Sequence, residues 1–128
     1  TRRIPAGPGL IRGLGWTGFM GEVADPEAAA VGVAEFLTTP VDWYAHLALS
    51  TSRHARVSLS SLAVPARFVA ARHDVLAGSR YMSSAADRMV DADYHEFRGT
   101  HFLPLERPDE LHGLLLDFLA KVEGRVER

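Results

Sequence analysis

The sequence has 128 residues, of which 47% are hydrophobic and 23% are charged, with a formal net charge of -2 and no cysteine. The lack of cysteine excludes disulfide frameworks, thiolate-bound metals and cysteine nucleophiles, and it fits a reducing compartment, so we expect a cytoplasmic protein. The cations are scattered and the apolar runs are short, so the sequence predicts neither nucleic-acid binding nor a membrane span. The length suits one domain, or a portion of a larger one.

The N-terminal half is predicted to consist of a glycine-rich loop followed by two helices. Residues 4–21 contain six glycines and two prolines, which disfavour regular structure, so we expect a loop with at most a short helical turn. The motif Asp25-Pro26-Glu27 is typical of a helix start and predicts a helix to about Leu37. The motif Thr39-Pro40-Val41-Asp42 predicts a second helix through Ala48, with the threonine side chain as its cap.

The C-terminal half alternates short apolar runs with helical periodicity. The runs at 67–71 and 94–97 predict two strands, and the first has the apolar character of a buried strand in a parallel sheet. Between them, apolar residues at helical spacing predict a helix from Ser79, its expected cap, to Val90. A last helix is predicted over 108–122. This order of strand, helix, strand and helix indicates a right-handed parallel βαβ unit.

Two chemically active side chains follow the predicted strands. Asp74 lies three residues after the first strand, and His101 lies four residues after the second. Parallel neighbouring strands end at the same edge of a sheet, so we expect the carboxylate and the imidazole to face each other there. A carboxylate can fix the tautomer of a histidine whose other nitrogen removes a proton from a nucleophile. The alternative is that both are simply solvated loop residues.

The sequence motifs around these residues resemble those of the C-terminal part of the α/β-hydrolase superfamily. They are Val64-Pro65 before the strand, Ala71-Arg72-His73-Asp74 after it, and the segment from Gly99 through His101 to Pro108. The match covers about 62–122, with Ala71 where the family usually places glycine. The resemblance implies an α/β fold: a mostly helical cap at 1–56, then at 57–128 the C-terminal βαβα part of a parallel core sheet. It also implies that Asp74 is the triad acid and His101 the base.

The family's nucleophile motif, Gly-x-Ser-x-Gly, occurs nowhere in the chain, and neither does its oxyanion-hole loop. In a family member both would lie upstream of Thr1. The resemblance therefore implies hydrolysis of a carboxylic ester or related acyl compound, without a cofactor, by a Ser-His-Asp mechanism whose serine lies in the remaining N-terminal core. An aspartate nucleophile, as in haloalkane dehalogenases and epoxide hydrolases, would use the same Asp74 and His101. The third possibility is a non-catalytic binding fragment derived from a hydrolase.

Aromatic residues are the candidates for contacting an apolar substrate. Trp16, Trp43 and Phe102 are predicted to bind substrate, and Phe19, Met20 and Tyr44 are further candidates for the same pocket. The alternative is that these side chains only hold the cap helices to the body, because aromatic residues at helical spacing are usually core.

Three other signals have weaker functional interpretations. Residues 13–18 match Gly-x-Gly-x-x-Gly but lack the preceding strand of a dinucleotide site. The remaining histidines are not at metal-ligand spacing, so no metal site is predicted. Glu106 is either a second carboxylate near His101 or an acceptor of backbone N–H groups at the entrance to the last helix, and the second interpretation is favoured.

Overall fold

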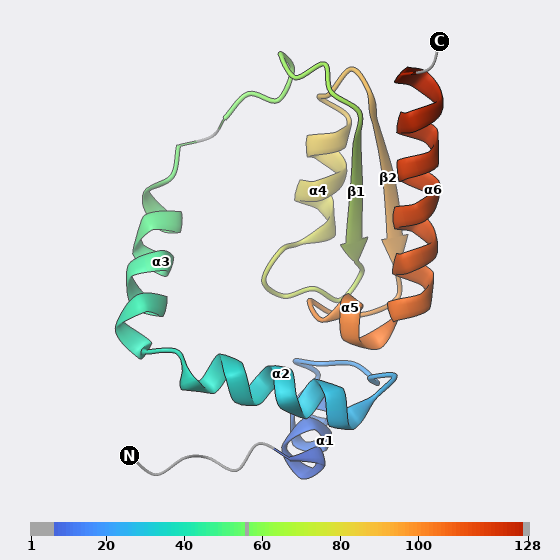
Figure 1. Cartoon of the computed structure of the whole chain (residues 1–128). Helices are drawn as coiled ribbons and strands as arrows, with labels where there is room; N and C mark the ends of the chain where they lie inside the picture. Colours follow the sequence, from blue (N-terminus) through green and yellow to red (C-terminus); the bar gives the residue numbers. More distant parts are fainter. Residues whose placement is uncertain (1–6, 56, 127–128) are drawn as a thin grey trace.

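The computed structural model of the chain describes residues 7–55 and 57–126, so the start of the predicted loop and cap, at 1–6, lies outside the described residues. The described part is mixed α/β, with a mostly helical N-terminal half and a two-stranded parallel sheet (Figure 1). In chain order the elements are α1 (Pro8–Trp16), α2 (Pro26–Thr38), α3 (Val41–Arg53), β1 (Ala66–Ala71), α4 (Ser79–Ala86), β2 (Ala92–Phe97), α5 (Leu103–Glu106) and α6 (Pro108–Val126).

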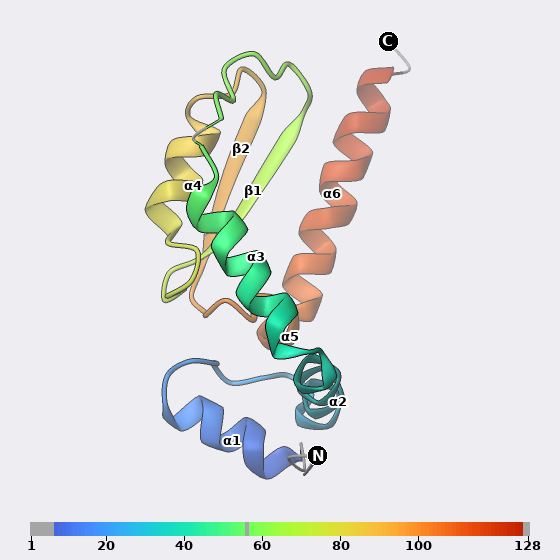
Figure 2. The same cartoon turned by 90° about the vertical axis from the view of Figure 1, so that its left-hand side faces the viewer.

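The two strands are parallel neighbours, as predicted. Their register runs from Ala66 opposite Ala92 to Ala71 opposite Phe97, so both strands end at one level of the sheet. Helices α4 and α6 lie on opposite sides of the strand pair (Figure 2). The carboxyl ends of both strands point toward α5 and α2 (Figure 1). The loops that carry the predicted acid and base therefore emerge together at the end of the sheet that faces α1 and α2 (Figure 1).

Arg67 joins both strands to the last helix. Its Nε and Nη2 donate to the two carboxylate oxygens of Asp93 on β2 at 2.8 Å each, and its Nη1 donates at 2.8 Å to the Leu114 carbonyl and to Asp117 on α6. The guanidinium lies 5.4 Å from the ring centroid of Phe118. The side chain is only 9% exposed, so its charge is compensated inside the sheet–helix contact.

The predicted loop at 4–21 is wrong for half of its length, because Pro8–Trp16 forms helix α1. Pro8 occupies the first turn, where its missing N–H costs nothing. Ile11 is buried in a cluster with Ala29 and Ala30 of α2. Burial of this apolar side offsets the unfavourable helix propensity of the glycines, about 1 kcal/mol each. The helix is followed by Gly18, whose φ of 73° is a conformation that glycine adopts without strain.

One of the three predicted helix N-caps is confirmed, and the other two are wrong. Asp25 caps α2 as predicted, with its Oδ1 accepting from the N–H groups of Glu27 and Ala28. Thr39 does not cap α3, because Pro40 takes the cap position and the Thr39 N–H closes the preceding helix on Phe36. Likewise Gly78, rather than the predicted serine, is the cap residue of α4. Helix α3 therefore begins one residue later than a Thr39 cap would require, whereas α4 begins one residue earlier than a Ser79 cap would require.

Two boundaries in the second half also differ from the prediction. Helix α4 ends at Ala86 rather than Val90, because the N–H groups of Arg88 and Met89 bond three residues back in tight turns that lead into β2. The short helix α5 was not predicted, and it turns the chain after β2 into α6. The predicted last helix is confirmed from Pro108 and extends to Val126.

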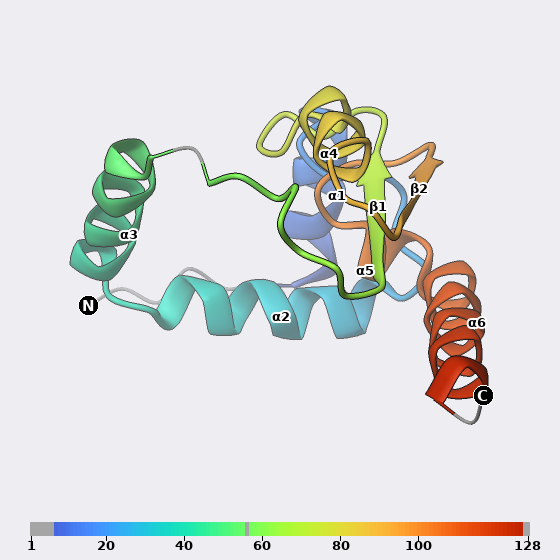
Figure 3. The same cartoon turned by 90° about the horizontal axis from the view of Figure 1, so that it is seen from above.

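Helices α1 and α2 lie at the carboxyl-end edge of the strands, whereas α3 stands apart from them (Figure 3). The Ala24 N–H donates to the Leu105 carbonyl at 2.9 Å, and Phe102 and Leu105 pack against the cluster of buried residues in α1 and α2. No helix in residues 7–55 and 57–126 has the length and apolar character needed to cross a bilayer.

Candidate active site

The loop after β1 holds the Asp74 carboxylate in one orientation. Its Oδ1 accepts from the backbone N–H groups of Leu76 and Ala77 at 2.8 Å each, closing a turn of the kind that aspartate favours. The side chain is 9% exposed. These bonds occupy one carboxylate oxygen and leave Oδ2 available to a second partner.

That second partner is His101, as the sequence predicts. The Nδ1 of His101 lies 2.9 Å from Asp74 Oδ2. An ionised carboxylate only accepts, so Nδ1 is the donor and a neutral ring then has Nε2 as its acceptor. Among the residues described, Nε2 of His101 has no hydrogen-bond partner. The side chain is 46% exposed, so the free nitrogen belongs to a ring that ligands can approach.

The loops that carry the pair are also joined through their backbones. The His73 N–H donates to the Gly99 carbonyl at 3.0 Å, and the Arg72 N–H donates to the Phe97 carbonyl at 2.9 Å. The pairing of the strands thus continues into both loops. It fixes the segment before Asp74 against the segment before His101, and the short imidazole–carboxylate distance follows from this registry.

The electrostatic environment favours an ionised Asp74. Burial raises the pKa of this carboxyl, but hydrogen bonds from the Ala77 N–H, the His101 ring and the Leu76 N–H together lower it further, so its pKa lies below the usual value. The carboxylate is therefore charged near neutral pH. A charged Asp74 orients the imidazole and stabilises its protonated form, which is the requirement for a histidine that acts as a base.

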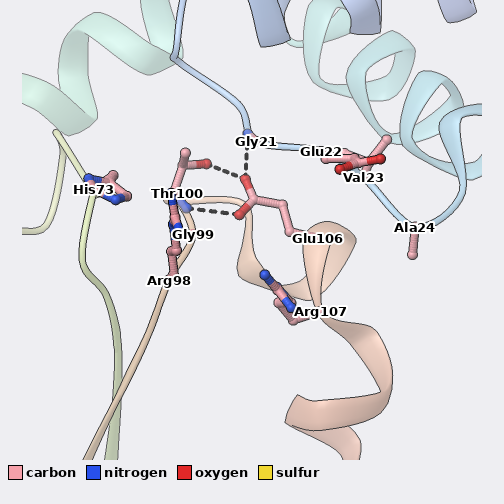
Figure 4. A pocket seen from close by; sticks show the side chains of 10 residues that line it. All are labelled: Gly21, Glu22, Val23, Ala24, His73, Arg98, Gly99, Thr100, Glu106 and Arg107. Carbon is pink, nitrogen blue, oxygen red and sulfur yellow. Dashed lines mark hydrogen bonds between the residues drawn. The ribbon is translucent and has the colours of Figure 1, made fainter.

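Glu106 accepts backbone N–H groups as favoured from sequence, but not those at the entrance to the last helix: one belongs to Gly21, 85 residues away, and one to Thr100, six residues away. Its Oε1 accepts from the Gly21 N–H at 2.6 Å and from the Thr100 hydroxyl, and its Oε2 accepts from the Thr100 N–H at 2.8 Å (Figure 4). The carboxylate is buried. It thereby ties the segment between α1 and α2 to the residue immediately before His101.

Two glycines make this arrangement possible. A Cβ placed on Gly21 would lie 2.8 Å from the Glu106 carboxylate, and one on Gly99 would lie 2.6 Å from both Glu106 Oε2 and Leu103 Cδ2. Both approaches are shorter than real Cβ contacts, so only glycine at these positions leaves room for the Glu106 side chain. Glu106, Gly21 and Gly99 also line a cavity of about 520 Å³ together with His73, Arg98 and Arg107 (Figure 4).

A second cavity, of about 630 Å³, lies beside His101. Helices α1 and α2 contribute Leu14, Val33 and Phe36 to its lining, and the loop after β2 contributes Phe102. The Phe102 ring meets the His101 ring edge-on at 5.8 Å between centroids. Within the described part of the chain, His101 is the one lining residue whose side chain can ionise or form conventional hydrogen bonds.

The three aromatic residues predicted to bind substrate are placed differently. Phe102 lines the cavity beside His101. Trp16 is 96% exposed at the end of α1 and lines a separate depression, and Trp43 is 65% exposed on α3 and is not part of the cavity wall. Tyr44 contacts Phe36 at 4.6 Å between ring centroids and so joins α3 to α2.

Sequence reasoning missed several cavity-lining residues. Leu14 lies in the segment predicted as a loop, and Val33 and Phe36 lie on a predicted helix whose partner surface was unknown. The available signal was the spacing of Leu10, Ile11 and Leu14, which suits one face of a helix. The neighbouring Gly-x-Gly-x-x-Gly match at 13–18 lies at the end of α1 and after no strand, so it lacks the setting of a dinucleotide site.

Comparisons of the chain with protein-family models, with curated proteins and with solved structures found no match. The chemical interpretation therefore depends on the geometry around Asp74 and His101 and on the motif resemblance in the sequence.

Proposed function

We propose that this chain is the acid- and base-bearing C-terminal part of an α/β-hydrolase that cleaves a carboxylic ester or a related acyl compound. The observation that carries the proposal is the Asp74–His101 pair beside an apolar cavity at the carboxyl ends of parallel strands. On this proposal α1 to α3 belong to the cap, and the strands belong to the end of the core sheet.

In the proposed reaction, His101 transfers protons and Asp74 orients it. Nε2 removes the proton of a serine hydroxyl as its oxygen attacks the substrate carbonyl, and the imidazolium then protonates the departing alcohol. Water, deprotonated by the same nitrogen, releases the acid from the acyl-enzyme. The serine and the oxyanion donors lie outside these 128 residues, because the chain contains no Gly-x-Ser-x-Gly.

The surfaces of the described residues support a further part of the core as partner. β1 is apolar on both faces apart from Arg67, yet within the described chain it pairs only with β2. Strands of this composition are typical of the interior of a parallel sheet. Helix α6 in turn exposes Leu115, Leu116 and Leu119. We assign these surfaces to contacts with the rest of the hydrolase core.

The test uses the complete polypeptide, including the coding sequence upstream of Thr1, with a panel of p-nitrophenyl esters. His101→Ala should abolish p-nitrophenol release, and Asp74→Asn should lower kcat about 10⁴-fold, as expected when the orienting carboxylate is lost. The matched control is His112→Ala, because His112 is exposed on α6. Turnover that survives in the His101 variant would refute the proposed base.

The same variant separates the alternatives. With a serine nucleophile, His101 acts in both halves of the reaction, so the alanine variant should release no first product. With an aspartate nucleophile, the histidine activates only the water, so the variant should release one equivalent of halide from a haloalkane, or open one equivalent of an epoxide, and then stop. A wild-type protein that binds these compounds but turns none of them over would identify a binding fragment.

A further inference from the structure

We infer that the cavity beside His101 selects an uncharged substrate by holding its apolar group between α1, α2 and Phe102, and that Gly32 sets how long this group can be. The inference rests on the proposed function for the reaction at His101. Binding of the apolar group can be measured apart from the reaction, because it needs only the cavity, and the described residues form that cavity by themselves.

The position of the cavity places the apolar group next to the reacting centre. His101 belongs to the cavity wall, and the ring nitrogen that is free of Asp74 is the one available to a ligand. A group bound here would therefore have its polar end at the imidazole and its apolar end toward α2. A volume of about 630 Å³ is within the usual range for sites that bind small molecules.

The composition of the wall determines the charge of the ligand. Apart from His101, the described lining residues are aliphatic, aromatic or glycine, with a methionine at position 20. Such a wall provides no partner for a buried ammonium or carboxylate, which would lose its hydration without compensation. The charged residues Arg98 and Arg107 instead line the separate cavity near Glu106. We therefore assign neutral, apolar groups to the cavity beside His101.

Gly32 is the position on α2 where the cavity has room for a side chain. It lines the cavity, and a Cβ built on it meets no atom within 4 Å. Its φ lies outside the left-handed region, so a larger residue fits the backbone, and leucine has the better helix propensity. Filling this space shortens the cavity without disturbing the packing of α2 on α1. Gly113 on α6 has the same properties but lies outside the cavity, so it is the matched control.

The experiment measures binding of a series of 2-alkanones from C6 to C12 to the full 128-residue chain by isothermal titration calorimetry. These ketones present a neutral carbonyl and an apolar chain but contain no bond that the proposed reaction cleaves. In the wild-type chain, affinity should rise with chain length until the cavity is full. Gly32→Leu should weaken binding of the longer ketones about 10- to 200-fold. Gly113→Leu should leave the whole series unchanged, and circular dichroism establishes that both variants are folded.

Equal affinities in the Gly32 and Gly113 variants, or tighter binding of the matching charged alkanoates than of the ketones, would overturn the inference. The outcomes are distinguishable from those of the ester assay. If ester turnover depends on His101 but is unchanged by Gly32→Leu, the proposed function is supported and the role of the cavity in substrate selection is refuted. If Gly32→Leu weakens ketone binding but the complete protein has no esterase activity, the cavity's binding role is supported and the proposed function is refuted.

In the complete enzyme, two substrate series then identify which half of the ester occupies the cavity. If it holds the acyl group, Gly32→Leu shifts the preference of p-nitrophenyl alkanoates toward shorter chains and leaves alkyl acetates unaffected. The reverse pattern assigns the cavity to the alcohol group. No shift in either series would overturn the role of Gly32 in specificity.

Discussion

Replacing Glu106 with glutamine keeps the size of a buried side chain but removes its charge and one of its two acceptor oxygens. In the native chain both oxygens accept, Oε1 from Gly21 and the Thr100 hydroxyl and Oε2 from the Thr100 N–H. Whichever way the amide is turned, its NH₂ group faces a donor. One charge-assisted bond is lost outright, a buried donor is left unpaired, and the remaining bonds become neutral.

The expected cost follows from these contacts. Hydrogen bonds to charged groups contribute about 1.5–3 kcal/mol, and an unpaired buried donor costs about 1–3 kcal/mol, so Glu106→Gln should lower the free energy of unfolding by about 2.5–6 kcal/mol. The assay is urea denaturation followed by far-ultraviolet circular dichroism. Glu110→Gln is the control, because Glu110 forms only an exposed ion pair with Arg107 and should cost less than about 0.5 kcal/mol.

The loss of these hydrogen bonds should also change the conformation of the loop that carries His101. Thr100 directly precedes His101, so loosening Glu106 should broaden or shift the backbone amide signals of both residues in a nuclear magnetic resonance spectrum. Gly99→Ala should act at the same point, because its Cβ would lie 2.6 Å from Glu106 Oε2. If Glu106→Gln is no less stable than Glu110→Gln, and the amide of Thr100 is unmoved, the carboxylate does not hold the two loops together.

Three further predictions concern the sheet and the acid. Arg67→Met should destabilise the chain by about 3 kcal/mol, because it leaves Asp93 without its bidentate partner, whereas Arg125→Met should cost less than about 1 kcal/mol; equal urea midpoints would contradict this. The lowered pKa of Asp74 adds stability that is present above its ordinary value of 3.8 and is lost as pH falls through the lower native value. The stability difference between wild type and Asp74→Asn should therefore shrink from pH 6 to pH 3, and a constant difference would refute the shift. Val69→Pro should reduce concentration-dependent association in sedimentation velocity, since the Val69 N–H points to the unpaired edge of β1; unchanged association would exclude that edge.

The direction of the Val69 N–H follows from the alternation of backbone groups along a strand. The N–H groups of Ala66 and Arg72 donate toward the β2 side, to Asp91 and Phe97. Residues an even number of positions away point the same way, and Val69, at an odd offset, points away. A proline there removes no bond between the two strands. The association experiment therefore tests the open edge rather than the integrity of the strand pair.

The placement of Asp74 opposite His101 could be predicted because it depends on short-range signals and one rule of topology. Apolar runs mark the strands, a helical segment separates them, and parallel strands end at the same edge. The loop lengths after each strand then place the two side chains at one level. The 2.9 Å contact between them is the direct result of this arrangement.

Helix α1 shows why local signals were insufficient elsewhere. The glycines of this segment predict that an isolated peptide would not be helical. Burial of Ile11 against Ala29 and Ala30, together with the packing of Leu14 on the same cluster, nevertheless offsets the cost of the glycines, and this burial exists only when α2 lies alongside. The same packing decides that Trp16 is exposed on α1 and lies outside the cavity beside His101, a placement that the local sequence does not reveal.

By itself, the sequence determined the strand–helix–strand order, the helix starts at Pro26 and Pro108, and the loops on which Asp74 and His101 lie. Each depends on neighbours within a few residues. Only the tertiary structure decided that Glu106 joins a loop 85 residues away in the chain and that α1 and α2 form the wall of an apolar cavity beside the imidazole. These features depend on the distance between surfaces remote in sequence, and that distance is set by the packing of α1 and α2 on α5 at the end of the sheet.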